Sequence, residues 1–446
     1  MDRTRLIWGG GSESQPTVPL HYPLLAVLAI TAAVAPNTWF IPSRQGYLIS
    51  LSVLLIIIVY AILLTDIRLR TDPIFLLLIG GYWLGLVAHY QFYSPHTELF
   101  EYIVVTPIAV FATVIVLPRL VRGRKQTFAM GLTLLGVLMS LFGIWMLWRV
   151  SQGDPFTIMG SSPAPIGQNV MGYERFPIHT RSVFSNSNSY GLFMMIVSLA
   201  ALYTVLARGG LLWALAFLTC VLGLFMSEGD AAYLGFTVGS LIVLSGRDRW
   251  LVVGGLGVGV LTLYAVIRIG HIPDVMDSTL MSRVNRWVQY LERLAEDPLW
   301  GIGFVDPGPE IGRSSGPHNS FLHALLNTGI IAGSLYLGSL AYALAHGIRK
   351  RWSVWTAFVV GSTVALFLFM GFESLFLGGL SVSSVALGFF LGCCLLNESE
   401  EDGDRIQPVT MSDAIRNSRT ARLLDSVRGP SQDSTGRPVD LREGDR

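Results

Sequence analysis

The sequence is poor in charged residues. Asp, Glu, Lys and Arg together make up 14% of its 446 residues, whereas soluble domains carry about 25%. Hydrophobic residues account for 52%, and the mean hydropathy is +0.54. These values exclude an ordinary soluble protein and indicate a chain that is solvated largely by lipid. The net charge of +1 says little about partners. We expect membrane lipids and no nucleic acid among them.

Cysteine is also scarce. The three cysteines lie in apolar segments, where thiols pack as small hydrophobic groups, so the sequence predicts no disulfide framework. Acylation of the adjacent Cys393 and Cys394 is the alternative to packing. Residues 1–396 contain no Walker motif, DxD pair or spaced His or Cys cluster, so we expect no cofactor and no metal. Acidic residues within the apolar segments are too sparse to indicate an ion relay.

Long apolar segments dominate what is present. A membrane-spanning helix requires about 20 mainly apolar residues. Twelve segments qualify: 20–34, 47–64, 73–91, 100–117, 128–148, 189–207, 211–226, 231–244, 250–267, 320–345, 354–371 and 376–396. The division of residues 211–244 into two spans is open. The sequence therefore predicts an all-α, polytopic membrane protein with about 12 transmembrane helices.

Basic residues alternate between successive short loops. With a cytoplasmic N-terminus, the inner loops hold Arg68, Arg70, Arg119, Arg122, Arg124, Lys125, Arg208, Arg247, Arg249, Arg349, Lys350 and Arg351, and the short outer loops hold Arg44. This asymmetry follows the positive-inside rule. We expect a multi-pass cell-membrane protein with both termini cytoplasmic. Residues 1–19 would be the N-terminus, 20–396 the transmembrane domain and 397–446 a disordered tail, with large outer loops at 149–188 and 268–319.

The second large outer loop contains an amphipathic helix, STLMSRVNRWVQYLERLAEDP, which Asp297-Pro298 should end. Leu280, Val284, Trp287, Leu291 and Leu294 follow helical spacing and should form its apolar face. Such a helix can lie at the bilayer interface. Arg283 lies at the boundary of the two faces, one turn before Trp287. A simple interfacial anchor is the alternative to a functional role.

The first large outer loop ends in RSVFSNSNSYG, directly before a span. Arg181, with Asn186 and Asn188 at a helix N-terminus, could bind an anion at the membrane surface. The alternative is a capped helix entrance with a solvated arginine.

The second large loop ends in GPHNSFLHALL. An imidazole can accept a proton near neutral pH, which makes His318 a candidate general base. Capping of the following helix by Asn319 or Ser320 is the structural alternative. His323 lies one turn deeper and is expected to pack within the helix.

Three motifs occur in order along the chain: Arg181-x-x-Phe184-x-Asn186-x-Asn188, then Arg283-x-x-x-Trp287 with Pro298 and Gly301-x-Gly303, then His318-Asn319-x-x-Leu322 with Gly329 and Gly333. Together they resemble the O-antigen ligase and polysaccharide polymerase superfamily. The chain departs from that family at Asp230, where an arginine is usual, and at Asn327, where a glutamate is common. One expected phosphate contact is then missing, or another residue such as Arg286 or Arg313 supplies it.

The resemblance implies a GT-C-like fold and a glycosyltransferase. The donor would be a polyprenyl-diphosphate-linked glycan, and the acceptor a glycan, lipid or protein. Arg181, Arg283 and Arg286, with Asn186, Asn188 and Asn319, would bind the diphosphate or glycan, and His318 would be catalytic. The transfer would be inverting and independent of metal. Ligase and polymerase are not separated, and a transporter or flippase, or a non-catalytic scaffold of a glycan assembly complex, are alternatives.

Overall fold

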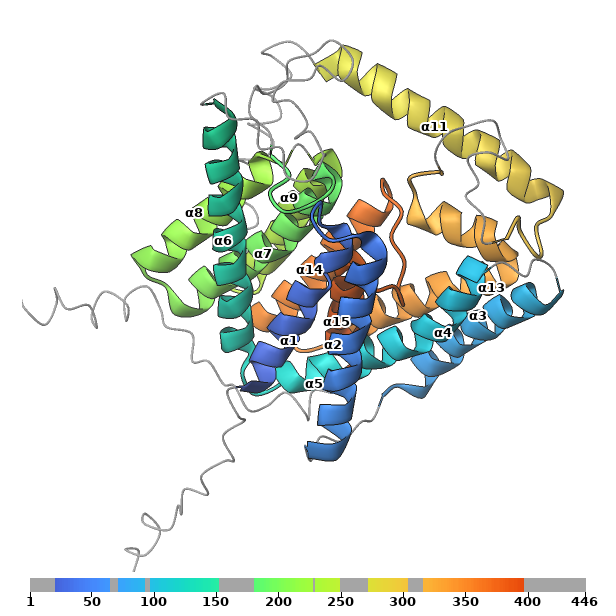
Figure 1. Cartoon of the computed structure of the whole chain (residues 1–446), viewed down its shortest axis with the longest axis horizontal. Coiled ribbons are helices and arrows are strands. Elements are labelled where there is room, and N and C mark those ends of the chain that lie inside the picture. The colour runs from blue at the N-terminus through green and yellow to red at the C-terminus, as the bar shows by residue number, and fades with distance from the viewer. Residues whose placement is uncertain are drawn as a thin grey trace, which may run out of the picture. The chain divides into compact units, whose positions relative to one another are not determined.

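The computed structural model describes residues 21–64, 71–92, 97–151, 180–227, 229–248, 272–303 and 316–396. All the regular elements within these ranges are helices (Figure 1). They are α1 (His21–Ala32), η1 (Ala35–Asn37), α2 (Ser43–Leu64), α3 (Pro73–Phe92), α4 (Thr97–Val110), η2 (Phe111–Val116), α5 (Leu117–Val121), α6 (Lys125–Ser151), α7 (Ser187–Arg208), α8 (Leu211–Phe225), α9 (Asp230–Ser245), α11 (Ile272–Glu296), α13 (Ser320–Ile348), α14 (Val354–Met370) and α15 (Val382–Leu395).

Six of the described helices are long and apolar enough to cross a membrane, and five shorter apolar helices accompany them. The prediction of an all-α, polytopic membrane protein is therefore confirmed. The open division of residues 211–244 is resolved, because α8 and α9 are separate helices. The expected span at 250–267, the N-terminal segment 1–19 and the tail 397–446 lie outside the described residues.

The expected start of the last span is wrong. The apolar run predicts a helix from Phe376, but α15 begins at Val382. Residues 371–381 instead form a connection in which Gly378 adopts a left-handed φ of 94°. A Cβ there would lie 2.6 Å from the Thr106 side chain, so the turn requires glycine. This connection carries the residue on which the candidate site is centred.

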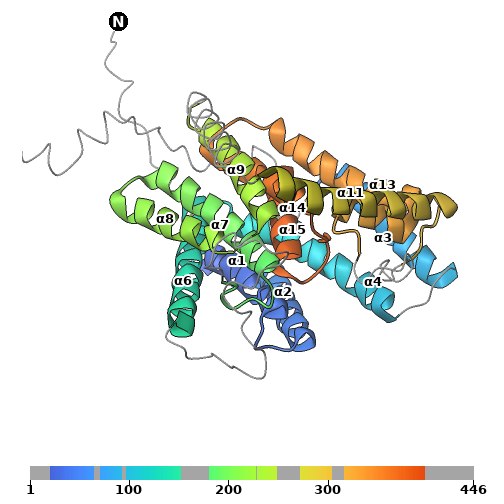
Figure 2. The ribbon, with the colours of Figure 1, turned by 90° about the horizontal axis from the view of Figure 1, so that it is seen from above.

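The centre of the bundle is α7, which packs against α6, α8, α9 and α14 (Figures 1 and 2). Within its span, 83% of the residues are buried, compared with 28% for α2 and α3. The exposed positions of α2 and α3 are largely apolar, as expected for helices that face lipid. The polar start of α7 is thereby fixed by neighbours on several sides.

Helices α9 and α14 approach closely at two glycines. A Cβ on Gly239 would lie 3.0 Å from the Gly361 carbonyl oxygen, and a Cβ on Gly361 would lie 2.7 Å from that of Gly239. Small residues permit such backbone contact between membrane helices. The contact fixes the axis of α14, whose last residue precedes the site.

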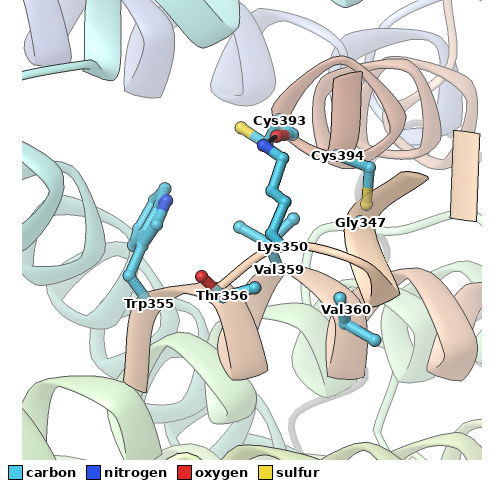
Figure 3. A pocket seen from close by; sticks show the side chains of 8 residues that line it. All are labelled: Gly347, Lys350, Trp355, Thr356, Val359, Val360, Cys393 and Cys394. Atoms are coloured by element: carbon cyan, nitrogen blue, oxygen red, sulfur yellow. Dashed lines mark hydrogen bonds between the residues drawn. The ribbon is translucent and has the colours of Figure 1, made fainter. Parts of the chain in front are cut away.

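At the other end of α14, Lys350 lines a small pocket together with Trp355, Thr356 and the two adjacent cysteines, Cys393 and Cys394 (Figure 3). Its ammonium group donates a hydrogen bond of 2.8 Å to the Cys393 carbonyl. A cation at the C-terminus of α15 satisfies a terminal carbonyl and complements the helix dipole. Because both cysteines are buried, their packing role is the one the structure supports.

Candidate functional site

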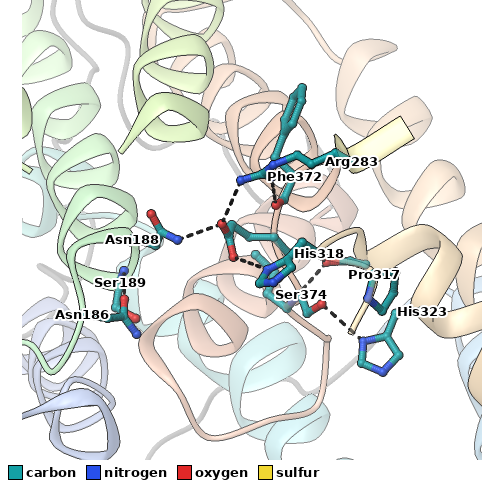
Figure 4. Close-up of polar contacts among 12 residues, drawn as sticks. Asn186, Asn188, Ser189, Arg283, Pro317, His318, His323, Phe372 and Ser374 are labelled. Atoms are coloured by element: carbon teal, nitrogen blue, oxygen red, sulfur yellow. Dashed lines mark hydrogen bonds and ion pairs between the residues drawn. The ribbon is translucent and has the colours of Figure 1, made fainter. Parts of the chain in front are cut away.

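Three polar side chains from distant parts of the sequence converge on the carboxylate of Glu373 (Figure 4). Asn188 Nδ2, at the start of α7, donates to Oε1 at 2.8 Å. Arg283 Nη2, on α11, lies 3.9 Å from the same oxygen. His318 Nδ1, just before α13, lies 3.4 Å from Oε2. The Glu373 side chain is only 16% exposed, so these donors surround a largely buried anion.

The Glu373 segment is held by side chains from other helices. Ser320 Oγ donates to the Glu373 carbonyl at 2.6 Å and accepts from the Leu375 amide at 2.8 Å. Tyr102 and Tyr336 bind the carbonyl and the amide of Leu377, each at 2.9 Å. Because the backbone is anchored at Glu373, Leu375 and Leu377, the point from which the carboxylate projects is well determined.

The backbone of His318 adopts a left-handed φ of 47°, which is uncommon for a residue other than glycine. Two contacts hold it there. Trp287 Nε1 donates to the preceding Pro317 carbonyl at 2.9 Å, and Asn319 Oδ1 caps α13 by accepting from the Leu322 amide at 3.0 Å. Such strain persists only where surrounding contacts determine it, and it is concentrated at functional sites. The predicted cap at Asn319 is confirmed.

The contact between His318 and Glu373 determines which imidazole nitrogen of His318 carries the lone pair. An ionised carboxylate can only accept, so His318 Nδ1 is the donor to Glu373. The Nε2 atom then carries the lone pair. Because the His318 side chain is 38% exposed, this nitrogen can receive a proton from a group outside the cluster.

Arg283 is positioned by α11 and by the aromatic ring of Phe372. Its Nη1 donates to the Phe372 carbonyl at 2.5 Å, and its guanidinium carbon lies 5.9 Å from the centre of the Phe372 ring. Trp287, one turn later on α11, also packs against this ring. One edge of the guanidinium is therefore anchored, while Nη2 reaches toward Glu373.

The predicted apolar face of α11 is only partly covered by other helices. Tyr290 and Leu294 are buried against Leu322 and Leu326 of α13, whereas Val284 and Leu291 are 38% and 52% exposed. Exposed apolar side chains on this face are compatible with a helix at the bilayer interface. Leu280 lies where side chains are outside the described residues. The predicted end of the helix is confirmed, since α11 stops at Glu296.

The described contacts of Glu373 do not include Arg181 or Asn186. Arg181 Nη1 donates to the Ser185 carbonyl at 2.8 Å. Asn186 Oδ1 accepts from the Ser189 amide at 2.7 Å and caps α7. The capping alternative thus holds for Asn186, whereas Asn188 points away from the helix end to Glu373 (Figure 4).

The segment that carries Arg181 is fixed by backbone contacts. Thr180 donates to the Met226 carbonyl at 2.7 Å, and the Ser185 amide donates to the Asn37 carbonyl at 2.6 Å. Arg286 is half-buried on α11, and no described contact of Glu373 comes from it. Arg313, the alternative phosphate ligand, lies outside the described residues.

Gly329, in the motif that begins at His318, has a structural explanation. Helix α13 breaks at Gly329, where φ is 70° and ψ is 178°. The turn after α11 supplies the lost backbone bonds: the Ile302 amide donates to the Leu326 carbonyl at 2.7 Å, and the Ile330 amide donates to the Pro298 carbonyl at 2.8 Å. Irregular backbone inside a membrane protein is tolerated when such partners are present. This junction fixes α11 against α13 and so fixes the position of Arg283 on α11 relative to His318, which directly precedes α13.

The sequence analysis missed Glu373. Its signal was a single acidic residue at the end of an apolar run, in FMGFESLF, and such residues are expensive within a membrane protein unless they have a role. We discounted acidic residues because they are too sparse for an ion relay. A search for isolated acids at span ends would have identified it.

The arrangement can bind an anion and move a proton. Arg283 and Asn188 present charged and amide donors, and His318 offers a free imidazole nitrogen next to them. Within the described ranges, no group of three or more His, Cys, Asp or Glu side chains is arranged to hold a metal ion. Independence from metal remains a prediction from the sequence.

Comparison with protein families gives one match. Residues 214–337 match the family model described as O-antigen ligase. This range includes Arg283, Arg286, His318 and Asn319, and it ends before Glu373. No curated protein matches the chain.

Proposed function

We propose that this chain, in which residues 214–337 match the O-antigen ligase family model, belongs to the O-antigen ligase and polysaccharide polymerase superfamily and transfers a glycan from a polyprenyl diphosphate carrier to an acceptor hydroxyl on the outer face of the membrane. The observation that carries this proposal is the convergence of Arg283 and His318 next to Glu373, at one end of the helix bundle. A cation for a diphosphate and a base for a hydroxyl are the two groups that such a transfer requires.

The reaction is a direct displacement. The acceptor oxygen attacks the anomeric carbon and forms the new glycosidic bond, while the bond from that carbon to the diphosphate oxygen breaks. The electron pair leaves with the polyprenyl diphosphate, and the acceptor proton passes to His318 Nε2. Direct displacement inverts the configuration at the anomeric carbon. Arg283 offers Nη2 to the charge that develops on the leaving diphosphate.

The pattern of basic loops supports the orientation. The cluster lies at the ends of α7, α13 and α14 that the positive-inside rule assigns to the outer face, and Lys350 lies at the opposite, inner end of α14. Both termini are then cytoplasmic, with residues 20–396 as the transmembrane domain and 397–446 as a cytoplasmic tail. We further propose twelve spans and a GT-C-like arrangement.

The other residues predicted to bind the diphosphate or the glycan have secondary roles in this scheme. We propose that Arg181 and Arg286 bind the diphosphate or the glycan. Asn186 and Asn319 act mainly through the helix ends that they cap. The acceptor, whether a glycan, a lipid or a protein, approaches the exposed side of His318.

The test is a gel profile of surface glycans from cells that carry the normal gene, a deletion, His318→Ala or Arg283→Ala at matched protein level. We expect both substitutions to reproduce the deletion, because each removes one required group. His346→Ala on α13 and Arg293→Ala on α11 are matched controls, since their side chains bind the Cys394 carbonyl and Glu296 instead. These controls should retain the normal profile.

The form of the profile distinguishes the remaining readings. Short, single-unit chains in the mutants would indicate a polymerase, and long chains left on the lipid carrier would indicate a ligase. If the deletion changes the profile while His318→Ala and Arg283→Ala do not, the enzyme assignment is wrong. A transporter, a flippase or a scaffold would then be the better description.

A further inference from the structure

Glu373 is an acid at the place where the proposed function requires an anion to bind. Its Oε1 atom takes the donors that suit a phosphate oxygen, namely Asn188 Nδ2 at 2.8 Å and Arg283 Nη2 at 3.9 Å. Carboxylates and phosphates are recognised by the same amide and guanidinium donors. The carboxylate therefore occupies the position of a ligand group in the free protein.

The two oxygens of Glu373 have different partners. The Arg283 distance of 3.9 Å exceeds a hydrogen bond, so this contact is a loose ion pair that a more highly charged acceptor can replace. The Oε2 atom faces His318 Nδ1 at 3.4 Å, on the other side of the carboxylate. A change at Oε1 can thus occur while the contact at Oε2 is kept.

We propose that the Glu373 carboxylate holds the donor site closed in the free protein and, once a diphosphate has displaced it, continues to orient His318. The inference rests on the proposed function and deepens it. On binding, Asn188 and Arg283 pass from Oε1 to the phosphate oxygens. Glu373 is a positioning residue that acts through His318. It accepts a hydrogen bond from His318 Nδ1–H and stabilises the protonated imidazole during transfer.

The surroundings of Glu373 allow the side chain to move while the backbone stays. Ser320 binds the Glu373 carbonyl and the Leu375 amide, and Arg283 Nη1 binds the Phe372 carbonyl independently of the carboxylate. Rotation about the side-chain bonds of Glu373 breaks none of these contacts. The exchange therefore requires only a small rotation of one side chain, which keeps Oε2 beside His318, and no movement of a helix.

The first test measures binding alone. Full-length protein in detergent micelles is titrated with farnesyl diphosphate, a short isoprenyl diphosphate, by calorimetry. Removing a competing negative charge should make Glu373→Gln bind about tenfold more tightly than the unaltered protein. Glu296→Gln removes an exposed carboxylate that pairs with Arg293 on α11 and should leave affinity unchanged. Equal or weaker binding by Glu373→Gln would overturn the proposal.

The second test separates positioning from a structural role. With lipid-linked donor extracted from membranes, Glu373→Gln should lower both KM for the donor and kcat, because the site opens while the acceptor of the His318 hydrogen bond loses its negative charge. Glu373→Asp keeps the charge and should recover part of kcat. A merely structural role would raise KM. If Glu373→Gln does not fold, Glu373→Asp provides the test: withdrawing the carboxylate by one methylene should tighten farnesyl diphosphate binding, and unchanged binding would refute the closure.

The two proposals fail in different ways. If His318→Ala and Arg283→Ala abolish transfer but Glu373→Gln does not bind diphosphate more tightly, the function stands and the role of Glu373 is wrong. If Glu373→Gln binds more tightly but His318→Ala transfers normally, the site closes as proposed and the assignment of the base is wrong.

Discussion

Gly301 and Gly329 lie backbone against backbone at the point where α13 breaks: a Cβ on Gly301 would lie 2.7 Å from the Gly329 amide nitrogen. Both residues have left-handed φ values, 73° and 70°. A Cβ on Gly329 would also lie 1.9 Å from the Leu299 carbonyl oxygen. The two glycines thus allow the turn after α11 to pack directly against the backbone of α13 at its break. The turn there supplies the hydrogen bonds that the helix loses.

Gly329→Ala should destabilise this junction strongly. The left-handed conformation alone costs an alanine about 1–2 kcal/mol, and the contact with the Leu299 carbonyl adds to this cost. Thermal unfolding in detergent and the surface glycan profile should both report the loss. Gly338→Ala is the matched control, because a Cβ there meets only Leu78 Cδ2 at 3.8 Å. Equal melting temperatures for the two variants would contradict the described junction.

The two asparagines at the start of α7 should behave differently. Asn186→Ala removes the cap of α7 and should lower the free energy of unfolding by about 0.5–2 kcal/mol while transfer persists. Asn188→Ala removes a donor to Glu373 and should reduce transfer with little loss of stability. Each variant serves as the control for the other, in unfolding and in transfer assays. The reverse pattern would show that the roles are exchanged.

Ser320→Ala should displace Glu373. The substitution leaves the Glu373 carbonyl and the Leu375 amide without their partner, which costs about 1–3 kcal/mol for a buried group. Because the carboxylate then loses its fixed position, we expect reduced transfer together with a lower melting temperature. Ser339→Ala removes a buried hydroxyl that bonds within α13, to the Tyr336 carbonyl, and should leave transfer unchanged. Normal transfer by Ser320→Ala would contradict the anchoring role.

Lys350→Met should affect stability alone. It removes the hydrogen bond to the Cys393 carbonyl and the favourable charge at the end of α15, worth about 0.3–1 kcal/mol. A methionine side chain still lines the pocket of Figure 3. The melting temperature should fall slightly, and the glycan profile should stay normal at matched protein level. A loss of transfer as large as that in His318→Ala would place a functional site at this end instead.

The sequence predicted most of the helices because each depends on local information. A run of apolar residues about 20 long forms a helix in a membrane whatever its neighbours are. The capping alternatives hold at Asn186 and Asn319 for the same reason, since a cap bonds to an amide only three residues away. Hydrophobicity could not locate the start of α15, because residues 376–381 are mostly apolar and turn only where Gly378 meets Thr106.

The sequence by itself determined the membrane helices and the candidate residues Arg283 and His318, because composition and motif spacing are properties of the chain. Only the tertiary structure decided that Asn188 serves Glu373 and that Glu373 lies between Arg283 and His318. The partners of Glu373 lie 55 to 185 residues away along the chain. No periodicity or local motif encodes such contacts, because they arise when the packing of α7, α11, α13 and α14 brings their ends together.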